Sequence, residues 1–178
     1  MALRPHRLRR RRPRCDVDYL WTPWRYHYIT TPEAPVGCVF CNAATGQNDA
    51  ATYVVHRAKW NFIILNRFPY TNGHVMIVPY EHVASMELLA EDAVIEMALL
   101  ARRTERHLRE IYNPDGMNMG MNLGKAAGAG IAGHVHMHML PRWTGDTNFM
   151  TVTGETRVLP EELPVTWGRL RAAFQERP

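Results

Sequence analysis

The sequence predicts an α+β domain, in which an antiparallel sheet of about five strands packs against one long helix and a C-terminal helix. Three observations predict this class. Short apolar segments bounded by turn residues recur from residue 52 onward, and one segment of about 25 residues has helical periodicity. The third observation is that three histidines alternate with apolar residues over 134–140, as on a strand with one buried face.

The first strands of the sheet are predicted between residues 52 and 80. Two of them have the sequences TYVVHR and WNFIILN, with a short turn between them near Ala58 and Lys59. The segment FPYTNG forms a turn, and HVMIVPY forms a third strand that ends at Pro79. Upstream of them, the proline-rich and aromatic segment WTPWRYHYITTPEAPVG is expected to run extended.

The long helix is predicted from about Glu87 to Tyr112, and Pro114 lies just beyond its end. Apolar residues recur within it at spacings near three and four, at Leu89, Val94, Met97, Leu100 and Leu108. His107 is expected at the surface, as are His6 and His27.

Strict alternation predicts the next strand, GMNMGMNLG, at residues 116–124. We expect its apolar residues to face the core together, and these are Met117, Met119, Met121 and Leu123. A flexible loop, GKAAGAGIAG, separates this strand from the histidine segment. At the end of the chain, Trp167, Leu170 and Phe174 fall on one face of a predicted short helix.

Charge divides the chain into a basic leader and a mildly acidic body. Residues 4–14 contain seven of the 21 basic side chains and no acid, which leaves 14 basic against 17 acidic side chains elsewhere. We therefore expect residues 1–15 to be a disordered basic leader and residues 16–178 to form a single domain with a C-terminal extension. A nucleic-acid contact by the leader is the sharper alternative, and a misassigned start would produce the same leader.

Composition limits the class of protein. Hydrophobic residues make up 46% of the 178 residues, which suits one globular domain. No apolar run approaches the roughly 20 residues of a membrane span. The cysteine count of three is odd, and no apolar segment follows the arginines as in a secretory signal. We therefore expect a soluble protein of a reducing cytoplasm, with no membrane partner.

The segment HVHMHMLPRW carries the strongest functional signal. On a strand that Pro141 ends, its three histidines would share one face, with neighbouring Cβ atoms about 7 Å apart. Three interpretations are open: hydrogen-bonded structural histidines, metal ligands, or phosphoryl and nucleotidyl chemistry. The third is favoured because the glycine-rich NLGKAAGAG upstream offers main-chain N–H groups to an anion. It is not a Walker A loop, since Ala126 follows Lys125.

The cysteine pair Cys38 and Cys41, in the sequence CVFC, is half of a zinc site. Two thiolates need two further ligands, and a reduced pair without metal is the alternative. His56, near the same predicted strands, is a spare candidate ligand.

The chain resembles the histidine triad family of nucleotide hydrolases and transferases. HVHMHML matches the signature of that family, GHVMIVPYEH resembles its second motif, and FIILNRFPY resembles its ribose-binding strand. LWTPWR, NLGKAAGAG and HMLPRWTGDTNFM are similar to the bacterial branch of diadenosine tetraphosphate (Ap4A) phosphorylase-like proteins. The resemblance covers about residues 19–163 and implies a HIT-like fold.

The resemblance also implies the roles of individual residues. His136 would be the nucleophile on the α-phosphorus, oriented by the carbonyl of His134, while His138 would bind phosphate and His74 would back the site. Other positions correspond to nucleotide contacts: Asn66 to ribose, Trp143 to the border of the nucleotide, and Asn122, Ala129 and Gly130 to phosphate. For Trp143 a place in the core, and for Asn66 a turn cap, are the structural alternatives.

Zinc-bearing members of the family imply the remaining metal ligands. Their ligand set maps to Cys38, Cys41, His82 and His134. Such a filled site would hold a structural Zn²⁺ that never touches substrate.

The expected activity is cleavage at the α-phosphate of an adenine dinucleotide polyphosphate such as Ap4A. It would proceed through a nucleotidyl-histidine intermediate and end by phosphorolysis, with inorganic phosphate as acceptor. The residues from Gly130 to Gly133 carry no side-chain donor, so main-chain groups would contact phosphate. A nucleoside phosphoramidase, an AMP-lysine hydrolase and a weakly catalytic nucleotide-binding regulator are the alternatives, and a homodimer is expected. His138 argues against the related uridylyltransferase branch, which carries Gln at this position.

Overall fold

A computed structural model describes residues 37–146 and 161–176 of the chain. Its centre is a five-stranded sheet in the order β1-β2-β3-β5-β4, with every neighbouring pair antiparallel. The strands are β1 (Val54–Arg57), β2 (Asn61–Leu65), β3 (Val75–Pro79), β4 (Gly116–Met121) and β5 (Met137–Arg142). The predicted α+β class and the number of strands are therefore confirmed.

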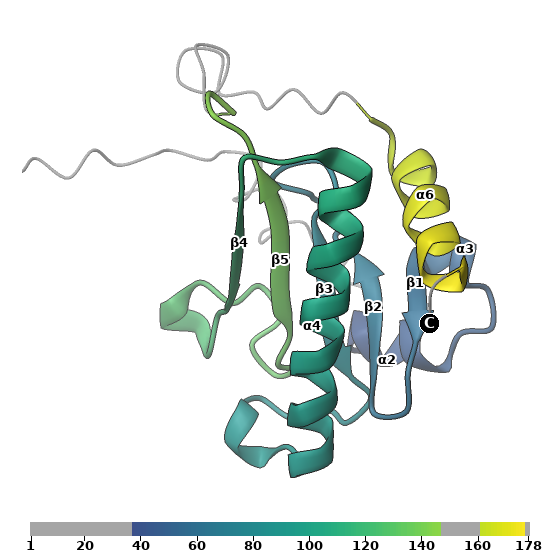
Figure 1. Ribbon diagram of the computed structural model, residues 1–178. Helices are drawn as coiled ribbons and strands as arrows, with labels where there is room; N and C mark the ends of the chain where they lie inside the picture. The colour runs from purple at the N-terminus through teal and green to yellow at the C-terminus, as the bar shows by residue number, and fades with distance from the viewer. Residues whose placement is uncertain (1–36, 147–160, 177–178) are drawn as a thin grey trace, which may run out of the picture.

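Helices cover both faces of the sheet (Figure 1). On one face lies the long helix α4 (Glu91–Tyr112), with α6 (Leu163–Glu176) beside it against β1. The opposite face carries the short helix α2 (Val39–Thr45), and α3 (Asp49–Thr52) leads into β1. Two short 3-10 turns complete the described elements, η1 (Met86–Leu88) and η2 (Lys125–Ala127).

Alternation along the strands divides the core into two layers. The layer under α4 and α6 takes one set of strand residues, which includes Val55, Ile63, Leu65, Val75, Ile77 and Met139. The layer under α2 takes their neighbours, together with Phe40 and Ala43: Val54, Phe62, Ile64, Met76 and Val78. Strands buried on both faces are almost wholly apolar, which explains the continuous sequence FIIL in β2.

The long helix begins later than its periodicity predicts. Residues 86–88 form η1, and Leu89 and Ala90 are extended before α4 starts with the acidic residues Glu91 and Asp92. Acidic side chains in the first turn are stabilised by the partial positive charge of the helix N-terminus. The helix ends at Asn113, which adopts the left-handed conformation with φ 43°, directly before Pro114.

The prediction that Pro141 ends the histidine strand is wrong. β5 starts only at Met137 and continues through Pro141 to Arg142, paired with β4. On its other side the pairing with β3 stops at Met139. The Pro141 carbonyl accepts from Thr71 on that same side. No strand requires an N–H donor there, so proline is tolerated at this position of β5.

Two predictions about which side chains are buried also fail. Met119 and Leu123 were expected to face the core, but they are 57% and 49% exposed, while Met117 and Met121 do pack against it. β4 is an edge strand of the described sheet, so part of its core-side face stays open to solvent. His107 is completely buried because α6 lies over this side of α4, with the Phe174 ring centroid 4.6 Å away.

The predicted C-terminal helix is confirmed as α6. Leu170 and Phe174 are buried, and the Trp167 indole N–H donates to the carbonyl of Val54 at 2.9 Å. Several predictions lie outside the described residues: the leader of residues 1–15, the extended segment 21–36, His6 and His27. Within the described ranges no helix is both long and apolar enough to cross a membrane.

Candidate active site and metal site

The three histidines of 134–138 lie on the α2 face of the sheet, at the start of β5. The segment before Met137 is extended without strand pairing, and the Val135 amide donates to the Val83 carbonyl at 2.7 Å. The His136 and His138 ring centroids are 4.8 Å apart, and Phe40 of α2 lies 4.8 Å from His136 and 5.3 Å from His134. The alternation thus places the imidazoles together as predicted.

His136 is held in one tautomer. Its Nδ1 lies 2.8 Å from the carbonyl oxygen of His134, and a carbonyl can only accept, so Nδ1 carries the proton. The Nε2 lone pair is then the nucleophilic atom of the neutral ring. Burial lowers the pKa of His136 below its ordinary value, although the bond to His134 partly opposes this. The ring is only 5% exposed and is neutral at pH 7.

A chain of hydrogen bonds fixes His138 in the complementary state. The Tyr70 amide donates to His74 Nδ1 at 3.2 Å, so neutral His74 carries its proton on Nε2. This Nε2 lies 3.0 Å from His138 Nδ1, which must accept. His138 therefore keeps its own proton on Nε2. One imidazole of the pair offers a lone pair and the other offers a donor, which are the two functions that attack at phosphorus requires.

Four side chains, one of them His134, form a metal-ligand set. The ligand atoms of Cys38, Cys41, His82 and His134 all lie within 4.8 Å of one another. His134 Nδ1 is 3.4 Å from Cys38 Sγ and 3.7 Å from Cys41 Sγ, and His82 Nδ1 is 3.2 Å from Cys41 Sγ. A tetrahedral zinc ion separates its nitrogen and sulfur ligands by about 3.6 Å, so the spacing fits.

The chemistry of the donors also fits zinc. The Nε2–H of His134 donates to the Pro79 carbonyl at 2.9 Å, which leaves Nδ1 as a lone pair facing the thiols. Burial raises the pKa of the Cys41 thiol, and the neighbouring Cys38 raises it further. A divalent cation would reverse that effect by stabilising both thiolates. Four protein ligands leave no open position, so the site is structural in type.

Comparisons with known proteins agree with this geometry. The family model of the HIT domain matches residues 47–145. An AP-4-A phosphorylase of Mycobacterium tuberculosis is 34% identical over 93% of this chain and 88% of its own length.

The chain belongs to the histidine triad (HIT) family.

Solved HIT structures share the fold. A Zn-bound histidine triad family protein from Mycobacterium smegmatis is 30% identical, with a TM-score of 0.64, over 79% of this chain and 94% of its own. A hypothetical histidine triad nucleotide-binding protein from Sulfolobus tokodaii also has a TM-score of 0.64 at 23% identity, over 78% of this chain and 93% of its own. The zinc ligand set expected from the sequence is therefore supported by the cluster of four side chains and by a Zn-bound relative.

The structure places the predicted nucleotide contacts in different surroundings. Asn66 lies beside His74, with Nδ2 at 3.4 Å from its Nδ1, and its Oδ1 accepts from the Phe68 amide at 2.9 Å. The Ala129 amide donates to Gly124 within the loop, whereas Gly130 is exposed. Trp143 lies edge-on to Tyr112 of α4, at 6.4 Å between centroids, and Asn122 is half-buried after β4.

Several residues that shape the site were not predicted. Tyr70 was interpreted only as part of a turn, but its amide and its ring, 4.8 Å from His74, both contact the site. Phe40 lies between the cysteines of CVFC, and that position was the available signal for it. His56, the spare metal candidate, stacks on Phe174 at 5.0 Å and is not one of the four clustered ligands.

Proposed function

We propose that this HIT protein transfers the nucleotidyl group of an adenine dinucleotide polyphosphate such as Ap4A, with His136 as the nucleophile and phosphate as the final acceptor. The observation that carries the proposal is the 2.8 Å bond between His136 Nδ1 and the His134 carbonyl, which leaves the lone pair of the buried, neutral ring on Nε2. The printed name of the M. tuberculosis relative, AP-4-A phosphorylase, supports the choice of substrate.

The proposed reaction has two steps. His136 Nε2 attacks the α-phosphorus of Ap4A, and the bond from this phosphorus to the bridging oxygen breaks, so that ATP leaves and AMP is bound to the ring. His138 Nε2–H donates to an oxygen on which charge develops. An oxygen of inorganic phosphate then attacks the same phosphorus, His136 leaves, and ADP forms. The structural zinc supplies rigidity around His134 and takes no part in either step.

The products decide the acceptor. Incubating the protein with Ap4A and phosphate should give ADP and ATP, and the ADP should disappear when phosphate is omitted. AMP and ATP in equal amounts, regardless of phosphate, would instead mean hydrolysis. Tight AMP binding without turnover of any dinucleotide, phosphoramidate or adenylylated amine would leave the binding regulator as the better description.

Asn66, Asn122, Ala129, Gly130 and Trp143 remain our proposed nucleotide contacts, and Asn66 has the strongest support because it touches His74. For phosphate, exposed Gly130 is better supported than Ala129, whose amide is already bonded to Gly124. The side-chain contacts can be tested by the KM of their variants for Ap4A, for example Asn66→Ala.

We also propose that the protein is a homodimer that pairs through β4. β1 is covered by α6, whereas β4 is a sheet edge with exposed Met119. An edge strand with exposed apolar residues is a template for pairing with another chain. Sedimentation equilibrium should therefore show a dimer for the natural chain and a monomer for Met119→Lys; a monomeric natural chain would refute the proposal.

A further inference from the structure

The metal site depends on the placement of a very short helix. Helix α2 has seven residues and contributes Cys41, while Cys38 is its N-cap residue and has no side-chain capping bond. Helices shorter than about 12 residues are marginal on their own, so neighbouring groups must fix the orientation of α2.

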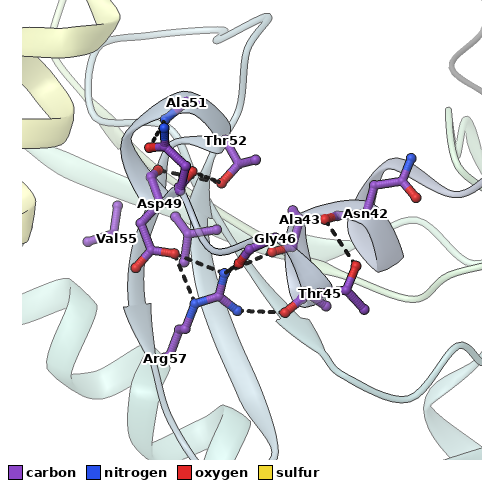
Figure 2. A network of polar contacts seen from close by, with 12 residues as sticks. Asn42, Ala43, Thr45, Gly46, Asp49, Ala51, Thr52, Val55 and Arg57 are labelled. Atoms are coloured by element: carbon purple, nitrogen blue, oxygen red, sulfur yellow. Dashed lines mark hydrogen bonds and ion pairs between the residues drawn. The ribbon is translucent and has the colours of Figure 1, made fainter.

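Arg57 of β1 holds the C-terminal end of this helix. Its Nη1 donates to the carbonyl of Ala44 at 2.8 Å, and its Nη2 donates to the carbonyls of Ala43 at 2.8 Å and Gly46 at 2.9 Å. Figure 2 shows the guanidinium between the end of α2 and Asp49. The last carbonyls of a helix lack partners within it, and a positive charge there is favourable. A strand of the sheet therefore binds the end of the ligand-bearing helix.

Asp49 fixes the guanidinium from the other side. Its Oδ1 accepts from Arg57 Nε at 2.9 Å, and its Oδ2 accepts from Arg171 Nη1 of α6 at 2.9 Å. All three side chains are less than one third exposed. The contacts thus form a continuous polar path from the C-terminal helix α6, through Asp49 and Arg57, to α2.

The orientation of α2 affects both the metal ligands and the nucleophile. Metal-ligand distances tolerate deviations of only about 0.2 Å, so a small rotation of α2 would separate Cys41 from His134. The same rotation would move Phe40, which packs against both His134 and His136.

We propose that Arg57 is a positioning residue of the metal site, and that Asp49 and Arg171 act through it, so that the Arg171 contact of α6 contributes to the affinity for zinc. The proposal rests on the metal site described above and is independent of the nucleotide substrate. Partners beyond the direct ligands of a metal site typically contribute about 10- to 100-fold to its affinity.

The test is zinc affinity of the full chain, measured by competition with a chromogenic chelator, with Co²⁺ absorption as a report of tetrahedral geometry. Arg57→Lys keeps the charge but cannot donate to three carbonyls and Asp49 together. We expect it to weaken zinc binding by about 10- to 100-fold and to change the Co²⁺ spectrum. Asp49→Asn leaves Arg57 in place and should give a smaller loss in the same direction.

The matched control is Arg169→Gln. Arg169 also lies on α6, and it bonds Glu161 and the Ile111 carbonyl, away from α2. It should lower stability but leave zinc affinity within about twofold, as expected when the metal's outer partners are untouched.

Two results with the Arg57, Asp49 and Arg169 variants would overturn the proposal. One is unchanged zinc affinity in Arg57→Lys, or in Asp49→Asn if the first variant does not fold. The other is an equal loss of affinity in Arg169→Gln, which would make the effect one of general stability. Cys41→Ser is the reference for the site itself, since zinc affinity at the natural level in this variant would mean that the ligand assignment, and the proposal with it, is wrong.

Discussion

The hydrogen-bond chain from Tyr70 through His74 to His138 makes a prediction about tautomers. His74→Leu removes the donor to His138 Nδ1 and leaves the Tyr70 amide without its acceptor. His138 is then free to hold its proton on Nδ1, where it no longer faces substrate. His74→Gln, by contrast, carries both an acceptor oxygen and a donor N–H and can preserve the polarity of the chain.

The magnitude follows from the group that is lost. A donor aimed at developing charge contributes about 10²–10³ in kcat, and we expect His74→Leu to lose about 10². Loss of the bond from the Tyr70 amide to His74 should cost about 1–3 kcal/mol of unfolding free energy, because His74 is almost completely buried. His74→Gln should stay within about tenfold of the natural rate, on the scale of one hydrogen bond of altered geometry.

The assay is single-turnover cleavage of Ap4A at pH 7, with thermal unfolding of each variant to confirm that it is folded at the assay temperature. If His74→Leu retains its rate within about twofold, His138 does not act as the donor described. If Gln is as damaging as Leu in a folded protein, the polarity of the chain is not what His74 contributes.

Three further predictions concern the buried histidines and the metal. Because burial lowers the pKa of His136, kcat/KM should stay constant as pH falls below the ordinary histidine value of about 6.5; a decline centred at 6.5 or above would contradict a buried neutral nucleophile. Exhaustive zinc chelation should lower the melting temperature and the rate together, and added zinc should restore both, whereas unchanged values would exclude the role given to His134. His107 is buried, its Nε2 has no hydrogen-bond partner among the described residues, and its Nδ1 has only Glu110 Oε2 at 3.7 Å, so His107→Leu should raise the free energy of unfolding by about 1 kcal/mol at pH 7. Burial, and then the charges of Arg106 and Arg103, lower the pKa of His107, while Glu110 opposes them. The natural protein should therefore lose stability as pH drops below the unfolded-state pKa near 6.5. Chemical denaturation across pH should show a smaller loss of stability in His107→Leu, and an equal loss would refute His107 as the cause.

Periodicity was sufficient for the elements with uniform surroundings. The continuous apolar run in HVMIVP and the helical spacing before Tyr112 predict β3 and α4, because β3 is buried on both faces and α4 buries one consistent face. Periodicity failed where a neighbour ends or begins. Met119 alternates like a core residue but lies exposed on the edge strand β4, and His107 is buried because α6 covers it.

Prediction of the site from the sequence has a similar limit. Side-chain chemistry and spacing, with the family resemblance, led to the cluster of Cys38, Cys41, His82 and His134. Groups that act through the main chain leave no such signal. The Tyr70 amide and the Pro79 carbonyl set the tautomers of two histidines, and any non-proline residue can supply the first and any residue the second. Arg57 could not be predicted from the sequence for a related reason, since its partners are the carbonyls of α2 and a carboxylate eight residues away.

The central claim is that His136 Nε2 forms a covalent bond to the α-phosphorus. It is tested most directly by mixing the protein with Ap4A in the absence of phosphate, quenching the reaction rapidly, and measuring the intact mass and the modified peptide. Our account predicts one AMP per chain on His136, formed at a rate no slower than turnover, and neither adduct nor turnover in a folded, zinc-loaded His136→Ala. Turnover by that variant, or an adduct on another residue that forms as fast as the reaction, would contradict it.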